Sequence, residues 1–396
     1  MSGNVQEQVG VGGFEIGEPE RRYIEEVLKT SRLSYGPMTR AFETQFAGLH
    51  GCRHAVFCNS GTSALHMALA VLKEKHGWED GDEVIVPATT FVATPNVILH
   101  NHLTPVFVDV ERDIYNLDPA LIEERITSRT RAILVVHLYG QPASMDGVLD
   151  VAQRHGLQVV EDSCETMFAS YKERSVGSMG DIGCFSTYVA HILVTGVGGF
   201  ATTSDPELAV MLRSCMNHGR DGIYLSIDDD KGKGGEELQE IVSRRFKFIR
   251  LGHSFRCTEL EAAIGLGQLE QAEGFLARRK EIAERYTQAF SPFEDRLQLP
   301  RAREDRTHSY MMYPLVLRDE PKWDLVNYLE ERGIETREMM PLINQPLYAE
   351  LFKVSPEEYP VTRWINESGF YIGSHPFLRD DQLNYVIEKM GDYFRS

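Results

Sequence analysis

The chain has 396 residues, of which 42% are hydrophobic, and its 41 basic and 59 acidic side chains give a formal net charge of −18. This length and composition predict one large and one smaller hydrophobic core. The strong acidity argues against a nucleic-acid partner, which requires a basic stripe on the surface. The N-terminus does not resemble a signal peptide, and no apolar run approaches the ~20 residues of a membrane helix. We therefore expect a cytoplasmic protein with no membrane partner.

The six cysteines are scattered along the chain and form no CxxC or CxC pair. They are Cys52, Cys58, Cys164, Cys184, Cys215 and Cys257. Such spacing gives little support to a zinc or iron–sulfur site. We expect reduced, buried thiols and no bound metal.

Short apolar segments alternate with helical segments in the first part of the chain. Helices are predicted at 19–30, 38–49 and 62–72, and strands at 54–58, 83–86, 105–110, 132–137 and 157–161. Alternation of this kind is typical of an α/β protein with a mainly parallel sheet covered on both faces. Functional groups are then expected beyond the carboxyl ends of the strands.

The second half of the chain predicts a polar insertion and a smaller α+β unit. The insertion, residues 222–243, is interpreted either as a solvated loop or as a mobile cover over the active site. Later elements are predicted as helices at 260–276 and on to about 290, strands at 310–317 and 335–338, and helices at 323–332 and 381–393. These predictions divide the chain into a large domain, residues 1–275, and a small C-terminal domain, residues 276–396.

Two groups that follow predicted strands are candidates for binding a charged ligand. Ser60, Gly61 and Thr62 open a helix, and backbone N–H groups at a helix start bind phosphate well. The same tripeptide is also an ordinary helix cap. Asp162 stands at the end of an apolar strand, where a carboxylate can pair with a cationic ring or simply cap the next helix.

A series of motifs along nearly the whole chain resembles the DegT/DnrJ/EryC1/StrS sugar aminotransferase family, which uses pyridoxal phosphate. The motifs include Ser-Tyr-Gly-Pro at 34–37, Val-Val-Glu-Asp-Ser-Cys-Glu at 159–165, Asn-His-Gly-Arg-Asp at 217–221, Gly-His-Ser-Phe-Arg at 252–256 and Gly-Ile-Glu-Thr-Arg at 333–337. The resemblance implies an aspartate-aminotransferase-like fold and a homodimer whose active sites use both subunits.

The resemblance also implies roles for individual residues. The cofactor-binding residues would be Gly61, Thr62, Phe91, Asp162, Glu165, Ser186 and Ser254. Asp162 would face the pyridine nitrogen and Phe91 would stack on the ring, although a phenylalanine here could equally belong to the core. His218, Arg256 and Arg337 would contact the nucleotide-sugar substrate, or serve as members of structural ion pairs.

The sequence departs from the usual family pattern at four positions. His191 stands where most members have the lysine that binds the cofactor covalently, and Glu165 replaces glutamine or histidine near the cofactor's phenolic oxygen. Val197 replaces a glutamate, and Ser254 replaces the asparagine that reaches the partner subunit's phosphate. The last two departures put that contact in doubt.

In the first two departures the sequence resembles a subgroup of the family, the nucleotide-sugar 3-dehydratases typified by GDP-4-keto-6-deoxymannose 3-dehydratase, which also have histidine for lysine and glutamate at the second position. That subgroup also carries an insertion ending in Phe-Lys-Phe, as at 246–248 here. The subgroup implies pyridoxamine phosphate held without a covalent bond, glutamate as amino donor, and His191 as the acid and base that eliminates a sugar hydroxyl. The alternatives are an aminotransferase that works without its lysine and a cofactor-binding pseudoenzyme or regulatory protein.

Overall fold

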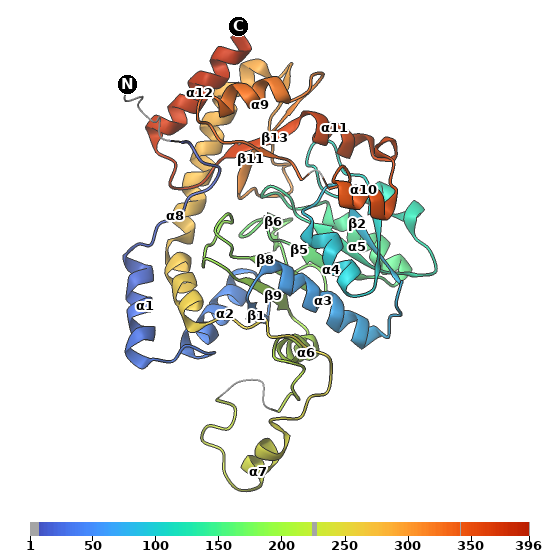
Figure 1. Cartoon of the computed structure of the whole chain (residues 1–396), viewed down its shortest axis with the longest axis vertical. Coiled ribbons are helices and arrows are strands. Elements are labelled where there is room, and N and C mark those ends of the chain that lie inside the picture. The colour runs from blue at the N-terminus through green and yellow to red at the C-terminus, as the bar shows by residue number, and fades with distance from the viewer. Residues whose placement is uncertain (1–7, 224–227, 341, 396) are drawn as a thin grey trace.

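The computed structural model describes residues 8–223, 228–340 and 342–395, which fold around two main sheets (Figure 1). The larger sheet has seven strands in the order β1-β9-β8-β5-β4-β2-β3. Their bounds are β1 His54–Cys58, β2 Glu83–Pro87, β3 Thr104–Val108, β4 Thr130–Val136, β5 Gln158–Asp162, β8 Ile182–Ser186 and β9 Gly199–Thr203. Strand β9 runs antiparallel to β1 and β8, and the other neighbouring pairs are parallel. The prediction of a mainly parallel sheet is confirmed.

Helices cover this sheet, and this cover explains why its strands are continuous runs of apolar residues rather than alternations of apolar and polar residues. Every residue of β8 and β9 is buried, since strands covered on both faces need apolar side chains throughout. Helix α3 packs on β8 and β9, and α5 packs on β4 and β5. The helices of this part are α1 Glu18–Thr30, α2 Pro37–Leu49, α3 Gly61–His76, α4 Ala93–His100, α5 Met145–His155 and α6 Pro206–Met216.

A single helix, α8 (Glu259–Phe290), joins the two halves of the molecule (Figure 1). The sequence predicted two successive helices here, and that prediction is wrong. Gly274 costs the helix about 1 kcal/mol relative to alanine, but packing on both sides of it keeps the helix continuous. Ala262 and Leu266 belong to the core of the large sheet, whereas Tyr286 and Phe290 belong to the second core.

The second core surrounds a smaller antiparallel sheet, in the order β10-β11-β13-β12. Its strands are β10 Leu297–Gln298, β11 Met312–Leu317, β12 Arg337–Glu338 and β13 Gly369–Gly373, and its helices are α9 Trp323–Glu330 and α12 Asp380–Arg395. This is the α+β unit that the sequence predicts. The boundary between residues 275 and 276 falls inside α8 and stays a prediction.

Two further helices of the C-terminal part pack against the large core instead. They are α10 (Pro346–Phe352) and α11 (Pro360–Ser368). The carboxylate of Asp109, just beyond β3, accepts hydrogen bonds from the backbone N–H groups of Val361 and Thr362, both at 2.9 Å. The C-terminal chain therefore returns to the large sheet after its first small-sheet strands.

The described part of the polar insertion, for which the sequence suggested a solvated loop or a mobile cover, includes a helix. It contains α7 (Gly235–Arg244), which ends with Arg244 paired to Asp221. Asp228 is held by Arg32 and Arg40 of the large domain, at 2.7 and 2.9 Å. Residues 224–227 of the predicted insertion lie outside the described residues. In the described ranges, no helix is long and apolar enough to cross a membrane.

Candidate active site

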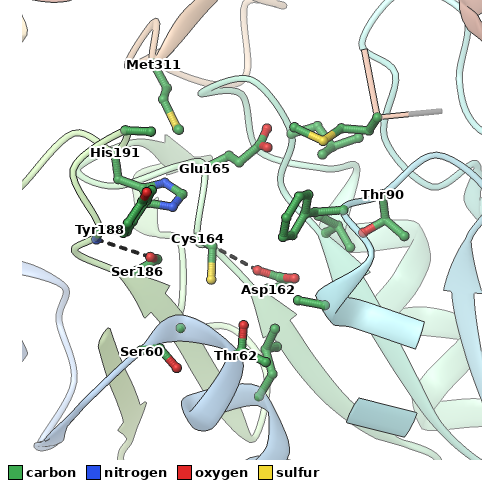
Figure 2. Close-up of a pocket in the computed structure, with 18 of the residues that line it drawn as sticks. Ser60, Thr62, Thr90, Asp162, Cys164, Glu165, Ser186, Tyr188, His191 and Met311 are labelled. Atoms are coloured by element: carbon green, nitrogen blue, oxygen red, sulfur yellow. Dashed lines mark hydrogen bonds between the residues drawn. The ribbon is translucent and has the colours of Figure 1, made fainter. Parts of the chain in front are cut away.

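A cavity of about 530 Å³ lies at the carboxyl ends of the large-sheet strands, where the small sheet and the N-terminal segment meet them (Figure 2). Sequence reasoning predicted this edge as the functional one. Seven of the predicted site residues line the cavity: Gly61, Thr62, Phe91, Asp162, Glu165, Ser186 and His191.

One end of the cavity is formed by the start of α3 and the end of β8. Ser60 caps α3, because its Oγ accepts a hydrogen bond of 3.0 Å from the N–H of Ser63. Gly61 follows in a crowded position, where a Cβ atom would lie 2.7 Å from Cys164 Sγ and 2.8 Å from Ser186 Cβ. The open N–H groups of a helix start, with the hydroxyls of Thr62 and Ser186 among the lining residues, suit an anionic group such as a phosphate.

Asp162 lies on the floor of the cavity at the end of β5 and is buried (Figure 2). Its Oδ2 accepts a hydrogen bond from Thr94 Oγ1 at 3.0 Å, and its Oδ1 accepts one from the N–H of Cys164 at 3.1 Å. Burial raises the pKa of this carboxyl, although the hydrogen bonds from Cys164 and Thr94 oppose the shift. The position is suited to a cationic partner supplied by a ligand.

Glu165 is a second buried carboxyl in the same cavity. Its Oε2 accepts a hydrogen bond of 3.0 Å from the N–H of Tyr139. Burial, with a smaller contribution from the charge of Asp162, raises the pKa of Glu165 to about 8. At neutral pH Glu165 therefore carries a proton and can donate it in a hydrogen bond.

His191 lies in the loop between β8 and β9, and Figure 2 shows its ring reaching into the cavity beside Glu165 and Tyr188. The backbone N–H of His191 donates to the carbonyl of Tyr188 at 2.9 Å, which fixes the loop. Its Nδ1 is buried without a hydrogen-bond partner in the described part of the chain. Burial, and then the charge of Arg279, lower the pKa of His191 to about 4, so the ring is a neutral base at pH 7.

Four predicted site residues lie outside this cavity within one chain. Ser254, Arg256 and His218 form their own group, in which Arg256 Nη2 donates to Ser254 Oγ at 2.8 Å and lies 3.2 Å from His218 Nε2. Arg337, on β12, pairs with Glu335. The structure brings neither group to the cavity of the same chain, and their binding roles stay predictions.

Several lining residues carry no signal in the sequence. Most come from segments away from the motifs, namely Val11, Gly12, Met311, Met312 and Tyr371, whereas Tyr188 and Met340 lie close to predicted site residues. Cys164 was visible only as part of a motif, and its Sγ lies against Gly61. The N-terminal segment and the small sheet close the cavity by tertiary packing, so no local pattern could reveal these residues.

The aromatic ring of Phe91 also agrees with a ligand-binding role rather than with the core. It lines the cavity with 56% of its surface exposed, whereas the neighbouring Thr89 and Thr90 are buried. A flat ring between Phe91 and the rest of the cavity would cover that apolar surface.

Comparison with known proteins identifies the family. A profile of the DegT/DnrJ/EryC1/StrS aminotransferase family matches residues 15–391. The chain belongs to this family. Its members are pyridoxal-phosphate-dependent enzymes that act on nucleotide sugars and include both aminotransferases and dehydratases.

Relatives of this chain include both an aminotransferase and dehydratases. A GDP-perosamine synthase of Caulobacter vibrioides is 34% identical over 96% of each chain. A dTDP-4-dehydro-2,6-dideoxy-D-glucose 3-dehydratase of Saccharopolyspora spinosa is 30% identical, over 96% of this chain and 85% of the relative. The structure of E. coli GDP-4-keto-6-deoxy-D-mannose-3-dehydratase with bound hydrated PLP matches with a TM-score of 0.86 and 25% identity, over 96% of this chain and 98% of that one. The predicted aspartate-aminotransferase-like fold is confirmed.

Proposed function

We propose that this chain is a pyridoxamine-phosphate-dependent dehydratase that removes the C3 hydroxyl of a nucleotide-linked 4-keto-6-deoxyhexose. The observation that carries the proposal is His191 in a cavity whose described lining residues include no lysine. Lys172, the nearest lysine in the sequence, sits in the turn between β6 (Ser170–Tyr171) and β7 (Arg174–Ser175) and pairs with Asp146 on the surface. The cavity therefore offers no amine that would bind an aldehyde cofactor covalently.

The lining residues fit a pyridoxal-type cofactor. The carboxylate of Asp162 lacks a cationic partner and would pair with a protonated ring nitrogen. The exposed ring of Phe91 would stack on the cofactor ring, and the start of α3, with Ser186, would bind its phosphate. When bound, such a cofactor supplies an amine that condenses with a keto group and a ring that takes up the electron pair of a broken C–H bond.

The chain's own residues would accept and donate the protons of the reaction. His191 is neutral at pH 7 and accepts a proton as the C–H bond breaks, then donates it to the hydroxyl that leaves C3 as water. Glu165 keeps its proton at the same pH and donates a hydrogen bond toward the cofactor's phenolic oxygen. Met311 and Tyr371 also line the cavity in which these steps would take place.

The overall balance gives a direct test. The C3 oxygen leaves as water, the amine nitrogen leaves as ammonia, and glutamate is oxidised to 2-oxoglutarate when it restores the amine of the cofactor. Purified protein would be incubated with pyridoxal phosphate, glutamate and GDP-4-keto-6-deoxymannose, and products measured by mass spectrometry. A 3-deoxy keto sugar with equimolar ammonia is expected, whereas an amino sugar without ammonia would reject the dehydratase assignment.

The second candidate is an aminotransferase in which His191 replaces the lysine. The similarity to a GDP-perosamine synthase favours it, and the same experiment detects it by its amino sugar. A protein that binds the cofactor but turns over none of the GDP- or dTDP-linked 4-keto sugars would instead match the pseudoenzyme alternative.

A homodimer would explain where the remaining predicted residues act. Ser254, Arg256 and His218 lie away from their own cavity, and Tyr188 and Val197 expose apolar surface at its mouth. We propose that a second copy contributes the Ser254, Arg256 and His218 group to the phosphate and substrate region. Light scattering of the purified protein should give twice the 44.9 kDa chain mass, and a monomer would reject this arrangement.

A further inference from the structure

Arg279, in the middle of α8, is a buried cation without an acidic partner. Only 3% of its surface is exposed. In the described part of the chain no carboxylate lies within salt-bridge distance of its guanidinium, and its Nε has no hydrogen-bond partner. An unpaired charge in a protein interior is costly, and even the pKa of this guanidinium is lowered to about 10. Because burying this charge destabilises the fold, we expect a role of Arg279 other than stabilisation.

The guanidinium is tied to the wall of the cavity. Its Nη1 donates to three backbone carbonyls, those of Tyr310 at 3.2 Å, Met311 at 2.8 Å and Ser374 at 2.9 Å. Met311 lines the cavity, and Figure 2 shows its side chain beside His191. Arg279 therefore joins the segments before β11 and after β13 to each other at the Met311 side of the cavity.

Two histidines flank this cation, and both are kept neutral. The charge of Arg279 adds to burial in lowering the pKa of His191 and of His375, each to about 4. Both rings have a buried Nδ1 without a partner in the described residues. His375 is also covered by the N-terminal segment, since a Cβ on Gly13 would lie 2.7 Å from its Nδ1.

The other titratable groups around His191 do not offset this cation fully. Those that line the same cavity are Asp162, Cys164, Glu165, Tyr188 and Tyr371. Glu165 is protonated at neutral pH, and burial raises the pKa of the Tyr371 hydroxyl and of the Cys164 thiol above their usual values. The other carboxyl of this set is Asp162, whose pKa is raised by burial.

We propose that Arg279 is a positioning residue of this site, which holds the Met311 side of the cavity in place and sets its positive charge close to His191. This inference rests on the proposed role of His191, but not on which sugar is used. It extends the site to a residue that touches neither cofactor nor substrate. It also gives a reason for a buried cation that contributes no ion pair.

The test is a histidine NMR titration of the full-length protein labelled with ¹³C at imidazole Cε1, with and without pyridoxal phosphate. His191→Asn assigns the His191 signal. In the wild type we expect a titration midpoint near pH 4. In Arg279→Gln the midpoint should rise by ~1 pH unit or more, as expected when a nearby like charge is removed, and the acid limb of kcat/KM should move upward with it.

Two further variants keep the test decisive. Arg279→Lys retains the charge and should leave the midpoint low even if its melting temperature falls, so it carries the test if Arg279→Gln does not fold. Arg278→Gln is the matched control, because Arg278 is the next residue of α8 but pairs on the surface with Glu281 and Asp380. An unchanged midpoint in Arg279→Gln, or the same rise in folded Arg279→Lys, would overturn the inference. Product analysis tests the dehydratase assignment separately, since the midpoints need no substrate.

Discussion

The Oγ1 hydroxyl of Thr94, in α4, donates a hydrogen bond of 3.0 Å to Oδ2 of Asp162, at the end of β5. Thr94 Oγ1 in turn lies 2.8 Å from Thr90 Oγ1, in the segment that carries Phe91. The carboxylate proposed to face the ring nitrogen is thus oriented by the segment that presents the stacking ring. Both contacts would be set before any ligand arrives, which favours binding because little ordering is then required.

Removing the charge of Asp162 should abolish most activity while leaving the fold intact. We expect Asp162→Asn to lower kcat by about 100-fold or more, because the electrostatic partner of the ring nitrogen is lost. Thr94→Val keeps the carboxylate and should lower the free energy of unfolding by about 1 kcal/mol, the usual contribution of one hydrogen bond. Steady-state kinetics and urea unfolding measure the two effects, and full activity in Asp162→Asn would argue against the ring-nitrogen role.

His191→Asn should separate cofactor binding from catalysis. The variant loses its base, so the rate should fall by about 100- to 10,000-fold, while absorbance titration should detect unchanged cofactor affinity. The exposed His155, which pairs with Glu123 far from the cavity, provides the matched control His155→Asn. Equal rates in wild type and His191→Asn would exclude His191 as the base.

His191→Lys should introduce covalent cofactor binding. A lysine amine at this position can react with the aldehyde of pyridoxal phosphate, and borohydride reduction makes that link permanent. Mass spectrometry of reduced protein should find the cofactor on residue 191 in the variant and on no lysine in the wild type. A labelled lysine in the wild type would mean that another residue holds the cofactor.

Glu165 makes the stability of the cofactor-free protein depend on pH. Because its pKa is raised to about 8 in the folded state, the folded protein holds a proton that the unfolded chain releases near pH 4.5. The contribution of this proton to the free energy of unfolding is fully present below pH 4.5 and is lost as pH rises toward 8. The loss is at most ~1.4 kcal/mol per pH unit.

Glu165→Gln mimics the protonated carboxyl and removes this loss. Relative to the wild type, the variant should gain unfolding free energy between pH 5 and pH 8, as followed by urea unfolding at several pH values. Parallel stability curves for the two proteins would contradict a proton on Glu165 at neutral pH.

Gly61→Ala should damage the phosphate end of the cavity. Its Cβ would meet Cys164 Sγ at 2.7 Å and Ser186 Cβ at 2.8 Å, so α3 and β8 must separate. We expect a loss of about 1–3 kcal/mol in stability and weaker cofactor binding. Gly48→Ala, in α2, is the control, since its Cβ would meet nothing within 4 Å. It should leave both properties unchanged or raise stability slightly.

The sequence by itself determined the family, the parallel sheet and the principal site. The signals were local, since Gly61, Asp162 and Ser186 each stand at a strand end or a helix start, and parallel strands bring such positions to one edge. His191 stood out for the same reason, as one substituted residue inside a contiguous motif.

Only the tertiary structure decided how the cavity is closed and how its groups titrate. Met311, just before β11, and Tyr371, in β13, line the cavity from more than a hundred residues beyond His191 in the chain, and Gly12 lines it from the N-terminal segment. The neutral states of His191 and Glu165 at pH 7 follow from burial by these distant segments, and burial is a property of packing rather than of residue type. The same packing made α8 one helix across Gly274 and buried Arg279, which bonds to backbone carbonyls and has no carboxylate partner among the described residues.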